Sequence, residues 1–343
     1  MTDSEAKTII DAKKKELGDN LVILGHHYQS DAVTECADFV GDSLELARKA
    51  SQIDKARFVV FCGVYFMAES AAILAPDKSV YIPDRQAGCP LADMAGYDDV
   101  LKAWDRLTRV SGSVIPVSYV NSTALIKAFC GKYGGVICTS GNSVKVLQWA
   151  YQRADKVFFL PDMNLGRNTA RKLKIPDGQI VLWDPQKSGG GLEDSDIERA
   201  KIILWKGWCP VHWPGFTADD VEAVKAKYPD IKVIVHPESD PQTVAASDES
   251  GSTAAILEYI RDMSPGESLA VGTEANMVKR AARRSRSVRI VPLREVFCDD
   301  MAKITLPKLA DTLLHLGDDT YRVTVPGDVA GYARVSLMNM LRI

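Results

Sequence analysis

An internal repeat is the feature that most constrains the fold of this chain of 343 residues. Three strand-like runs end in polar or aromatic residues, namely GHHYQ at 25–29, SYVNS at 118–122 and HPESD at 236–240. After each run a serine begins a helix-like pattern, at Ser43, Ser140 and Ser252. A second strand follows, and each copy then reaches one loop cysteine: Cys89, Cys209 or Cys298. Because these features recur in the same order, the sequence predicts three copies of one structural unit.

Within these copies, strand patterns alternate with helix patterns. Runs such as LVILG at 21–25 and KVIVH at 232–236 are short, apolar and bounded by Gly, Pro or Asp, which is typical of strands buried on both faces of a parallel sheet. Helical patterns such as 143–154 lie between them, and this alternation predicts an α/β fold. The middle copy is longer, which we attribute to a Gly-rich insertion at 184–198, with a few extra residues at 127–135.

The expected architecture is α/β, with three parallel-sheet domains related by a pseudo-threefold axis. The length supports this architecture because 343 residues suggest two or three domains, and 46% hydrophobic residues suffice for their cores. We place the first domain at 1–93, the second at 94–210 and the third at 211–305. The C-terminal segment 306–343 is expected to pack back on the first domain.

Charge and apolar content argue against several classes of function. A net charge of −3 gives no general attraction to nucleic acid or to a membrane surface, and no apolar run is long enough to cross a bilayer. The basic run KRAARRSR at 279–286 is interpreted as a solvated helix face rather than an anion site. Seven scattered cysteines argue against a disulfide framework and predict reduced thiols in the cytoplasm.

The three loop cysteines point to a metal centre shared by the three domains. Strand ends and helix N-termini line the ligand crevice of a parallel sheet, so three such units around one axis would bring Cys89, Cys209 and Cys298 together. Thiolates are the usual ligands of iron–sulfur clusters. A [4Fe–4S] cluster held by three cysteines leaves one iron open as a Lewis acid. A zinc site of three thiolates and His212 is the alternative. The remaining cysteines are interpreted as core residues: Cys36, Cys62, Cys130 and Cys138.

Hydroxyl groups at helix starts are candidate anion sites, because helix N-termini present free N–H groups and a partial positive charge. One such serine is more often an ordinary N-cap. Serines at three equivalent positions, with Thr253 beside Ser252, instead indicate a substrate with several anionic groups. The strand ends add residues suited to binding or to proton transfer: His26, Tyr28, Tyr119, Asn121, His236 and Glu238.

These motifs resemble the quinolinate synthase family, the A proteins of de novo NAD biosynthesis. The likeness runs from about residue 20 to the C-terminus. It rests on ILGHHYQ, ADFVGDSLELARKA, FCGVYFMAES, AGCPLADM, YVNSTA, CTSGNS, LPDMNLGR, GWCPVH, HPE, GST, GTE and CDDMAKITL. The resemblance implies three α/β domains around a central [4Fe–4S] cluster. It also implies condensation of iminoaspartate with dihydroxyacetone phosphate to quinolinate, with loss of phosphate and water.

The resemblance also implies roles for individual residues. The cluster ligands would be Cys89, Cys209 and Cys298. The substrate or product site would contain His26, Ser43, Tyr119, Asn121, Ser140, His236, Glu238, Ser252 and Thr253. The catalytic candidates are Tyr28, Glu238, His236 and His212. The sequence departs from many relatives at His27 and Tyr65, and neither insertion touches a cysteine motif.

Two interpretations of other classes stay open. One is a metal-free phosphosugar isomerase or aldolase of α/β type, in which Cys209 is a core thiol. The other is a non-catalytic, zinc-stabilised binding protein. If the enzyme interpretation is right, the instability of iminoaspartate favours a transient contact with the L-aspartate oxidase that produces it.

Overall fold

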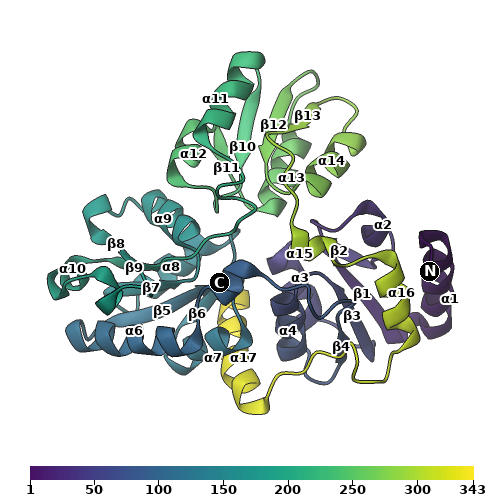
Figure 1. Ribbon diagram of the computed structural model, residues 1–343, viewed down its shortest axis with the longest axis horizontal. Helices are drawn as coiled ribbons and strands as arrows, with labels where there is room; N and C mark the ends of the chain where they lie inside the picture. The colour runs from purple at the N-terminus through teal and green to yellow at the C-terminus, as the bar shows by residue number, and fades with distance from the viewer.

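The computed structural model describes residues 1–343 and contains three parallel sheets, which form three lobes around a common centre (Figure 1). We call these lobes the first, second and third units. The first sheet has the order β2-β1-β3-β4, with β1 Leu21–His26, β2 Phe39–Gly41, β3 Phe58–Cys62 and β4 Ser79–Tyr81. The third sheet has the order β11-β10-β12-β13, with β10 Lys232–Val235, β11 Glu249–Ser250, β12 Ser268–Gly272 and β13 Arg289–Pro292. The identical order confirms the repeat.

The second sheet has one strand more than the others, in the order β6-β5-β7-β9-β8. Its strands are β5 Val114–Tyr119, β6 Val136–Cys138, β7 Lys156–Leu160, β8 Ile180–Trp183 and β9 Ile202–Trp205. Strand β9 holds the position of β4 and β13, and the edge strand β8 pairs with it in parallel. The insertion in the middle unit therefore includes β8 as well as the expected 184–198, and it stays at the sheet edge farthest from β5.

Helices connect the strands of each unit. The first unit contains α1 Asp3–Leu17, α2 Asp31–Thr34, α3 Ser43–Ser51, α4 Tyr65–Leu74 and α5 Pro90–Asp93. The second contains α6 Tyr97–Val110, α7 Ala124–Lys132, α8 Ser143–Tyr151, α9 Met163–Lys172 and α10 Asp194–Arg199. The third contains α11 Ala218–Lys227, α12 Pro241–Ala246, α13 Thr253–Asp262, α14 Ala275–Arg284 and α15 Asp299–Ala302. None of the helices is both long and apolar enough to span a membrane.

The C-terminal segment divides between two units, whereas the sequence analysis assigned 306–343 to the first alone. Helix α16, Leu306–Leu314, packs on α1 and α2 of the first unit. Helix α17, Gly327–Arg342, packs mainly on α7 of the second unit and also contacts α4 (Figure 1). The α7–α17 approach is close enough that a Cβ at Gly131 would lie 1.9 Å from the carbonyl oxygen of Tyr332. Helix α17 thus joins the first and second units, and the domain boundaries themselves stay predictions.

Candidate active site

A cavity of about 250 Å³ lies where the three units meet. Its lining includes every residue proposed from the sequence except Ser252: His26, Tyr28, Ser43, Cys89, Tyr119, Asn121, Ser140, Cys209, His212, His236, Glu238, Thr253 and Cys298. Ser252 is the N-cap of α13 and accepts a hydrogen bond from the amide of Ala255. It lines a neighbouring polar cavity instead.

The strand ends reach the cavity because the sheets are parallel and their carboxyl edges face the common centre. The first and third units repeat the same local turn there. The Nδ1 atom of His26 accepts the amide of Tyr28 at 3.1 Å, and Nδ1 of His236 accepts the amide of Glu238 at 3.4 Å. Tyr28 and Glu238 therefore occupy equivalent positions in two copies of the repeat. The same bonds place the ring proton of each neutral histidine on Nε2.

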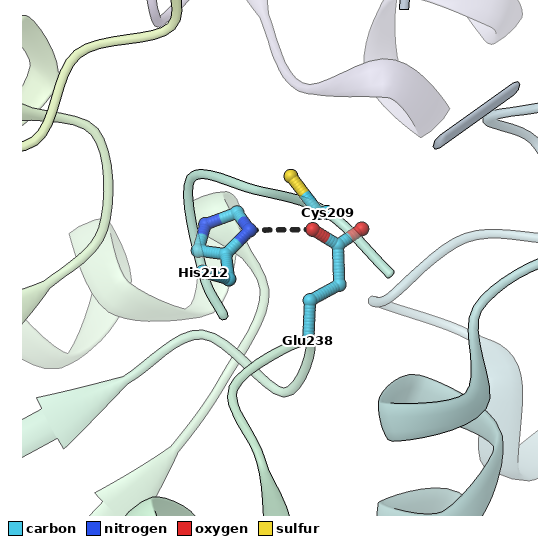
Figure 2. A group of neighbouring side chains, drawn as sticks. All are labelled: Cys209, His212 and Glu238. Atoms are coloured by element: carbon cyan, nitrogen blue, oxygen red, sulfur yellow. Dashed lines mark hydrogen bonds and ion pairs between the residues drawn. The ribbon is translucent and has the colours of Figure 1, made fainter. Parts of the chain in front are cut away.

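Three side chains from separate segments form a hydrogen-bonded chain in the cavity wall. Glu238 Oε2 lies 2.5 Å from Nδ1 of His212, as Figure 2 shows. The Nε2 atom of His212 lies 3.4 Å from the hydroxyl of Tyr28 and 3.2 Å from Oγ1 of Thr273. The Tyr28 hydroxyl is also 2.8 Å from Thr273 Oγ1, and it accepts a hydrogen bond from Thr253. This carboxylate–imidazole–phenol arrangement can relay a proton.

Burial and mutual charge set the protonation states of this chain. Burial raises the pKa of Glu238, but His212 and His236 more than offset it, so the carboxyl stays ionised with a pKa of about 2. Burial raises the pKa of Tyr28 above its ordinary value, and the hydroxyls of Thr253 and Thr273 only partly counter this rise. The site therefore holds an ionised carboxylate and a protonated phenol at neutral pH.

The three loop cysteines present their sulfurs to the same cavity, and all three are partly exposed, whereas the other four cysteines are buried. Cys89 and Cys298 are the N-caps of the short helices α5 and α15. Backbone N–H groups face each sulfur, from Leu91 and Ala92 at Cys89, Asp300 and Met301 at Cys298, and Val211 at Cys209. Such donors favour a thiolate.

Although the three residues as a whole are partly exposed, their sulfur atoms lie away from bulk water. This burial opposes the effect of the N–H groups and raises the pKa of all three thiols, that of Cys298 to about 11. The other two sulfurs and Glu238 raise the pKa of Cys209 further. Three thiols that repel one another when ionised need a cation among them to bind as thiolates. This donor set fits a metal centre.

Cys209, His212 and Glu238 form a tighter group, whose ligand atoms lie within 4.8 Å of one another (Figure 2). Both ring nitrogens of His212 already have partners, however, with Nδ1 at Glu238 and Nε2 near Tyr28 and Thr273. A zinc ion bound by His212 would have to displace one of these contacts. The arrangement favours a proton-relay role for His212 over metal ligation.

Two residues that support the site were not predicted from the sequence. Thr273, fully buried just after β12, joins Tyr28 to His212. Asp162, fully buried just after β7, is the N-cap of α9, and its carboxylate faces the amide of Cys209. Both follow the carboxyl end of a strand within the motifs GTE and LPD. That position is the signal by which they could have been found.

The helix start predicted at Ser43 is confirmed, and the one predicted at Ser140 is wrong. Helix α3 begins at Ser43, and the carboxylate of its N-cap Asp42 accepts the amides of Leu44 and Glu45. Helix α8 begins at Ser143 after the N-cap Asn142, so Ser140 precedes it in a turn. Both Ser43 and Ser140 still line the cavity, and Oγ of Ser140 accepts from Nε2 of His236 at 3.2 Å.

The buried histidines predict a loss of stability in mild acid. Burial, together with His212, lowers the pKa of His236 to about 3, although Glu238 opposes this. The unfolded imidazole has a pKa near 6.5, so the unfolded chain binds the extra proton first and stability falls as the pH drops below about 6.5. For His236 alone the loss between pH 7 and pH 5 is about 2 kcal/mol.

Urea unfolding of the cluster-free chain at both pH values measures this effect. We expect His236→Gln to show a smaller drop in unfolding free energy than the unsubstituted chain. His315→Gln serves as the control because His315 is exposed, and since Asp311 raises the pKa of His315, this variant should show a drop at least as large as that of the unsubstituted chain. An equal drop in His236→Gln and the unsubstituted chain would contradict the assignment.

Comparison with known proteins shows the family of the chain. The family model described as quinolinate synthetase A protein, NadA, matches residues 7–342. A quinolinate synthase of Corynebacterium glutamicum is 45% identical over 100% of this chain and 88% of its own length. Those of Streptomyces coelicolor and Anoxybacillus flavithermus are 43% and 45% identical, over 97% and 96% of this chain and 86% and 90% of their own lengths. The chain therefore belongs to the quinolinate synthetase A family of enzymes.

Proposed function

We propose that the chain is a quinolinate synthase, which condenses iminoaspartate with dihydroxyacetone phosphate to give quinolinate, phosphate and water. The observation that carries the proposal is the single cavity in which three repeat-related cysteines meet the Glu238–His212–Tyr28 chain. A metal-free isomerase or aldolase gives no reason for three facing thiols. A zinc-stabilised binding protein gives no reason for an ionised carboxylate beside a protonated phenol.

A [4Fe–4S] cluster fits the donor set, with Cys89, Cys209 and Cys298 as its three protein ligands. Backbone N–H groups face each sulfur, as they do in sites whose thiolates must stay ionised. When bound, such a cluster supplies an open iron that acts as a Lewis acid toward a hydroxyl or carbonyl oxygen.

The chain's own residues would bind the anionic substrates. Thr253 is the first residue of α13, where the helix dipole favours carboxylate or phosphate. Ser43 offers its hydroxyl at the start of α3, whose first amides already donate to the carboxylate of Asp42. Asn121 Oδ1 is buried without a hydrogen-bond partner, as expected of a group that pairs with a ligand. His26 and Tyr119 complete the wall and exclude water. Ser252 contributes through its cap on α13 rather than through the main cavity.

Glu238 and Tyr28 take opposite roles in proton transfer. The Glu238 carboxylate stays ionised and bonded to His212, so the pair can take up a proton from substrate carbon or nitrogen on the imidazole, with the carboxylate stabilising the imidazolium that forms. The Tyr28 phenol keeps its proton, so it can donate to an oxygen that leaves as water. His236 stacks on His212, with ring centroids 4.2 Å apart, and holds its orientation.

Anaerobic turnover with the two substrates tests the proposal. We expect quinolinate as the product. The purified protein should be brown and contain about four iron and four sulfide per chain, as a [4Fe–4S] cluster requires. A colourless chain with one zinc, or a metal-free chain that interconverts phosphosugars, would contradict it. We also propose a cytoplasmic location and a transient contact with L-aspartate oxidase. Addition of that oxidase to the turnover assay tests the contact.

A further inference from the structure

The basic run 279–286 contains one arginine that is not solvated. Arg280 is 7% exposed and lies on α14 at the boundary between the third and first units, whereas Arg283 and Arg284 on the same helix are exposed. The interpretation of the run as a solvated helix face is therefore wrong for Arg280. A buried guanidinium is costly unless acceptors surround it.

Arg280 donates to the turn that follows β1 in the first unit. Its Nη1 bonds the carbonyl oxygen of Gln29 at 3.0 Å, and its Nη2 bonds the carbonyl oxygen of His27. The same Nη1 lies 2.9 Å from Oδ1 of Asp31 and 3.3 Å from Oγ1 of Thr34. One planar group thus holds two peptide carbonyls and two side chains of the first unit.

The carbonyl group of Tyr28, which lies between those of His27 and Gln29, also accepts a hydrogen bond from α14. Nδ2 of Asn276 lies 3.4 Å from the carbonyl oxygen of Tyr28. Glu274, which is fully buried, orients that amide, because its Oε1 accepts from Nδ2 of Asn276 at 2.9 Å. None of the carbonyls of His27, Tyr28 and Gln29 accepts a backbone hydrogen bond. The third unit therefore supplies the hydrogen-bond donors to this turn.

The turn held in this way carries the Tyr28 phenol. The ring of Tyr28 packs edge-on against His26 of its own unit, but the contacts of its hydroxyl are with Thr273, Thr253 and His212 of the third unit. The position of the phenol thus depends on how the first unit docks on the third. Among the residues of α14, Arg280 makes the most hydrogen bonds to the first unit at and beside this turn. Arg280 does not line the cavity.

We propose that Arg280 is a positioning residue for Tyr28, fixing the 27–29 turn on the third unit and so placing the phenol against His212. The proposal rests on the proposed function. A lysine cannot replace Arg280, because an ammonium group lacks the fork that reaches two carbonyls and a carboxylate together. Small displacements of a reacting group can cost about 100-fold in rate.

The test compares Arg280→Gln and Arg280→Lys with Arg284→Gln, a matched control on the same helix that is exposed. In anaerobic turnover we expect both Arg280 variants to lose 10- to 100-fold in kcat with KM and iron content nearly unchanged. Arg284→Gln should behave like the unsubstituted enzyme. Unchanged kcat in Arg280→Gln would overturn the proposal.

A double-mutant cycle separates positioning from general stabilisation. If Arg280 acts through the phenol, Arg280→Gln should cost little further kcat once Tyr28 is already Phe. A full additional loss in the Tyr28→Phe background would show a role unrelated to Tyr28. The cycle also covers a folding defect, because such a defect would lower iron content and activity in both backgrounds.

A readout independent of turnover keeps this inference distinct from the proposed function. With ¹³Cζ-labelled tyrosine, the Tyr28 resonance is assigned by its absence in Tyr28→Phe. We expect this resonance to move in Arg280→Gln and to stay in place in Arg284→Gln. A resonance unmoved in Arg280→Gln would contradict the positioning role even if the enzyme makes quinolinate. If the Tyr28 resonance shifts in Arg280→Gln but the unsubstituted chain makes no quinolinate, the proposed function would be contradicted and the positioning role would stand.

Discussion

Cys209→Ser is expected to remove iron binding altogether and to reduce quinolinate synthesis below detection. A serine hydroxyl has too high a pKa to ionise readily in this buried site, and its oxygen is a harder ligand than a thiolate. The remaining two thiols, Cys89 and Cys298, cannot hold a cluster that depends on three. Replacing either of them by serine should have the same result. Iron and acid-labile sulfide, measured on anaerobically purified protein, report the loss.

The matched control is Cys62→Ala. Cys62 is fully buried at the end of β3 and does not line the cavity. Its removal should cost about 1 kcal/mol of unfolding free energy, as a small core truncation does, and leave the iron content unchanged. If Cys62→Ala lost the iron and Cys209→Ser kept it, the ligand assignment would be wrong.

Glu238→Gln should lower kcat by about 100- to 10,000-fold, the usual worth of a positioned acid or base, while the cluster stays bound. The amide has nearly the same shape but cannot take up a proton, and it no longer supplies the negative charge that faces His212. Steady-state kinetics of the anaerobic enzyme, with iron content measured in parallel, make the comparison.

Glu222→Gln provides the control for the loss of one carboxylate. Glu222 is exposed on α11 of the third unit and does not line the cavity. We expect it to keep the full kcat. A Glu238→Gln enzyme with kcat near that of the control would exclude Glu238 as the base and leave proton transfer to the histidines.

The shared site could be predicted because its residues obey local rules of a parallel sheet. His26, Tyr119 and His236 stand at strand ends, and the carboxyl ends of all three sheets face one centre. The cysteines could be separated from core thiols because each follows the last β-strand of its copy, β4, β9 or β13. The repeat thus carried information about positions that are far apart along the chain.

The features that escaped prediction are those set by partners from elsewhere in the sequence. Arg280 has the same residue type and helix as the exposed Arg284, and only the first-unit turn makes it buried. The expected helix start at Ser140 failed because Asn142 takes the cap position in TSGNS. Strand β9, Ile202–Trp205, also escaped prediction, because its place in the sheet is set by pairing with β7 and β8.

Helix α17 has a consequence for how this protein forms during synthesis. Domains fold as the growing chain leaves the ribosome, beginning with the N-terminal one, so each of the three sheets can form in turn. The surfaces of α7 and α4 that α17 covers remain bare until residues 327–342 emerge. In nascent or truncated chains the sheets would therefore be folded while the first and second units are not yet joined by α17. We expect these chains to have the greatest need for chaperones.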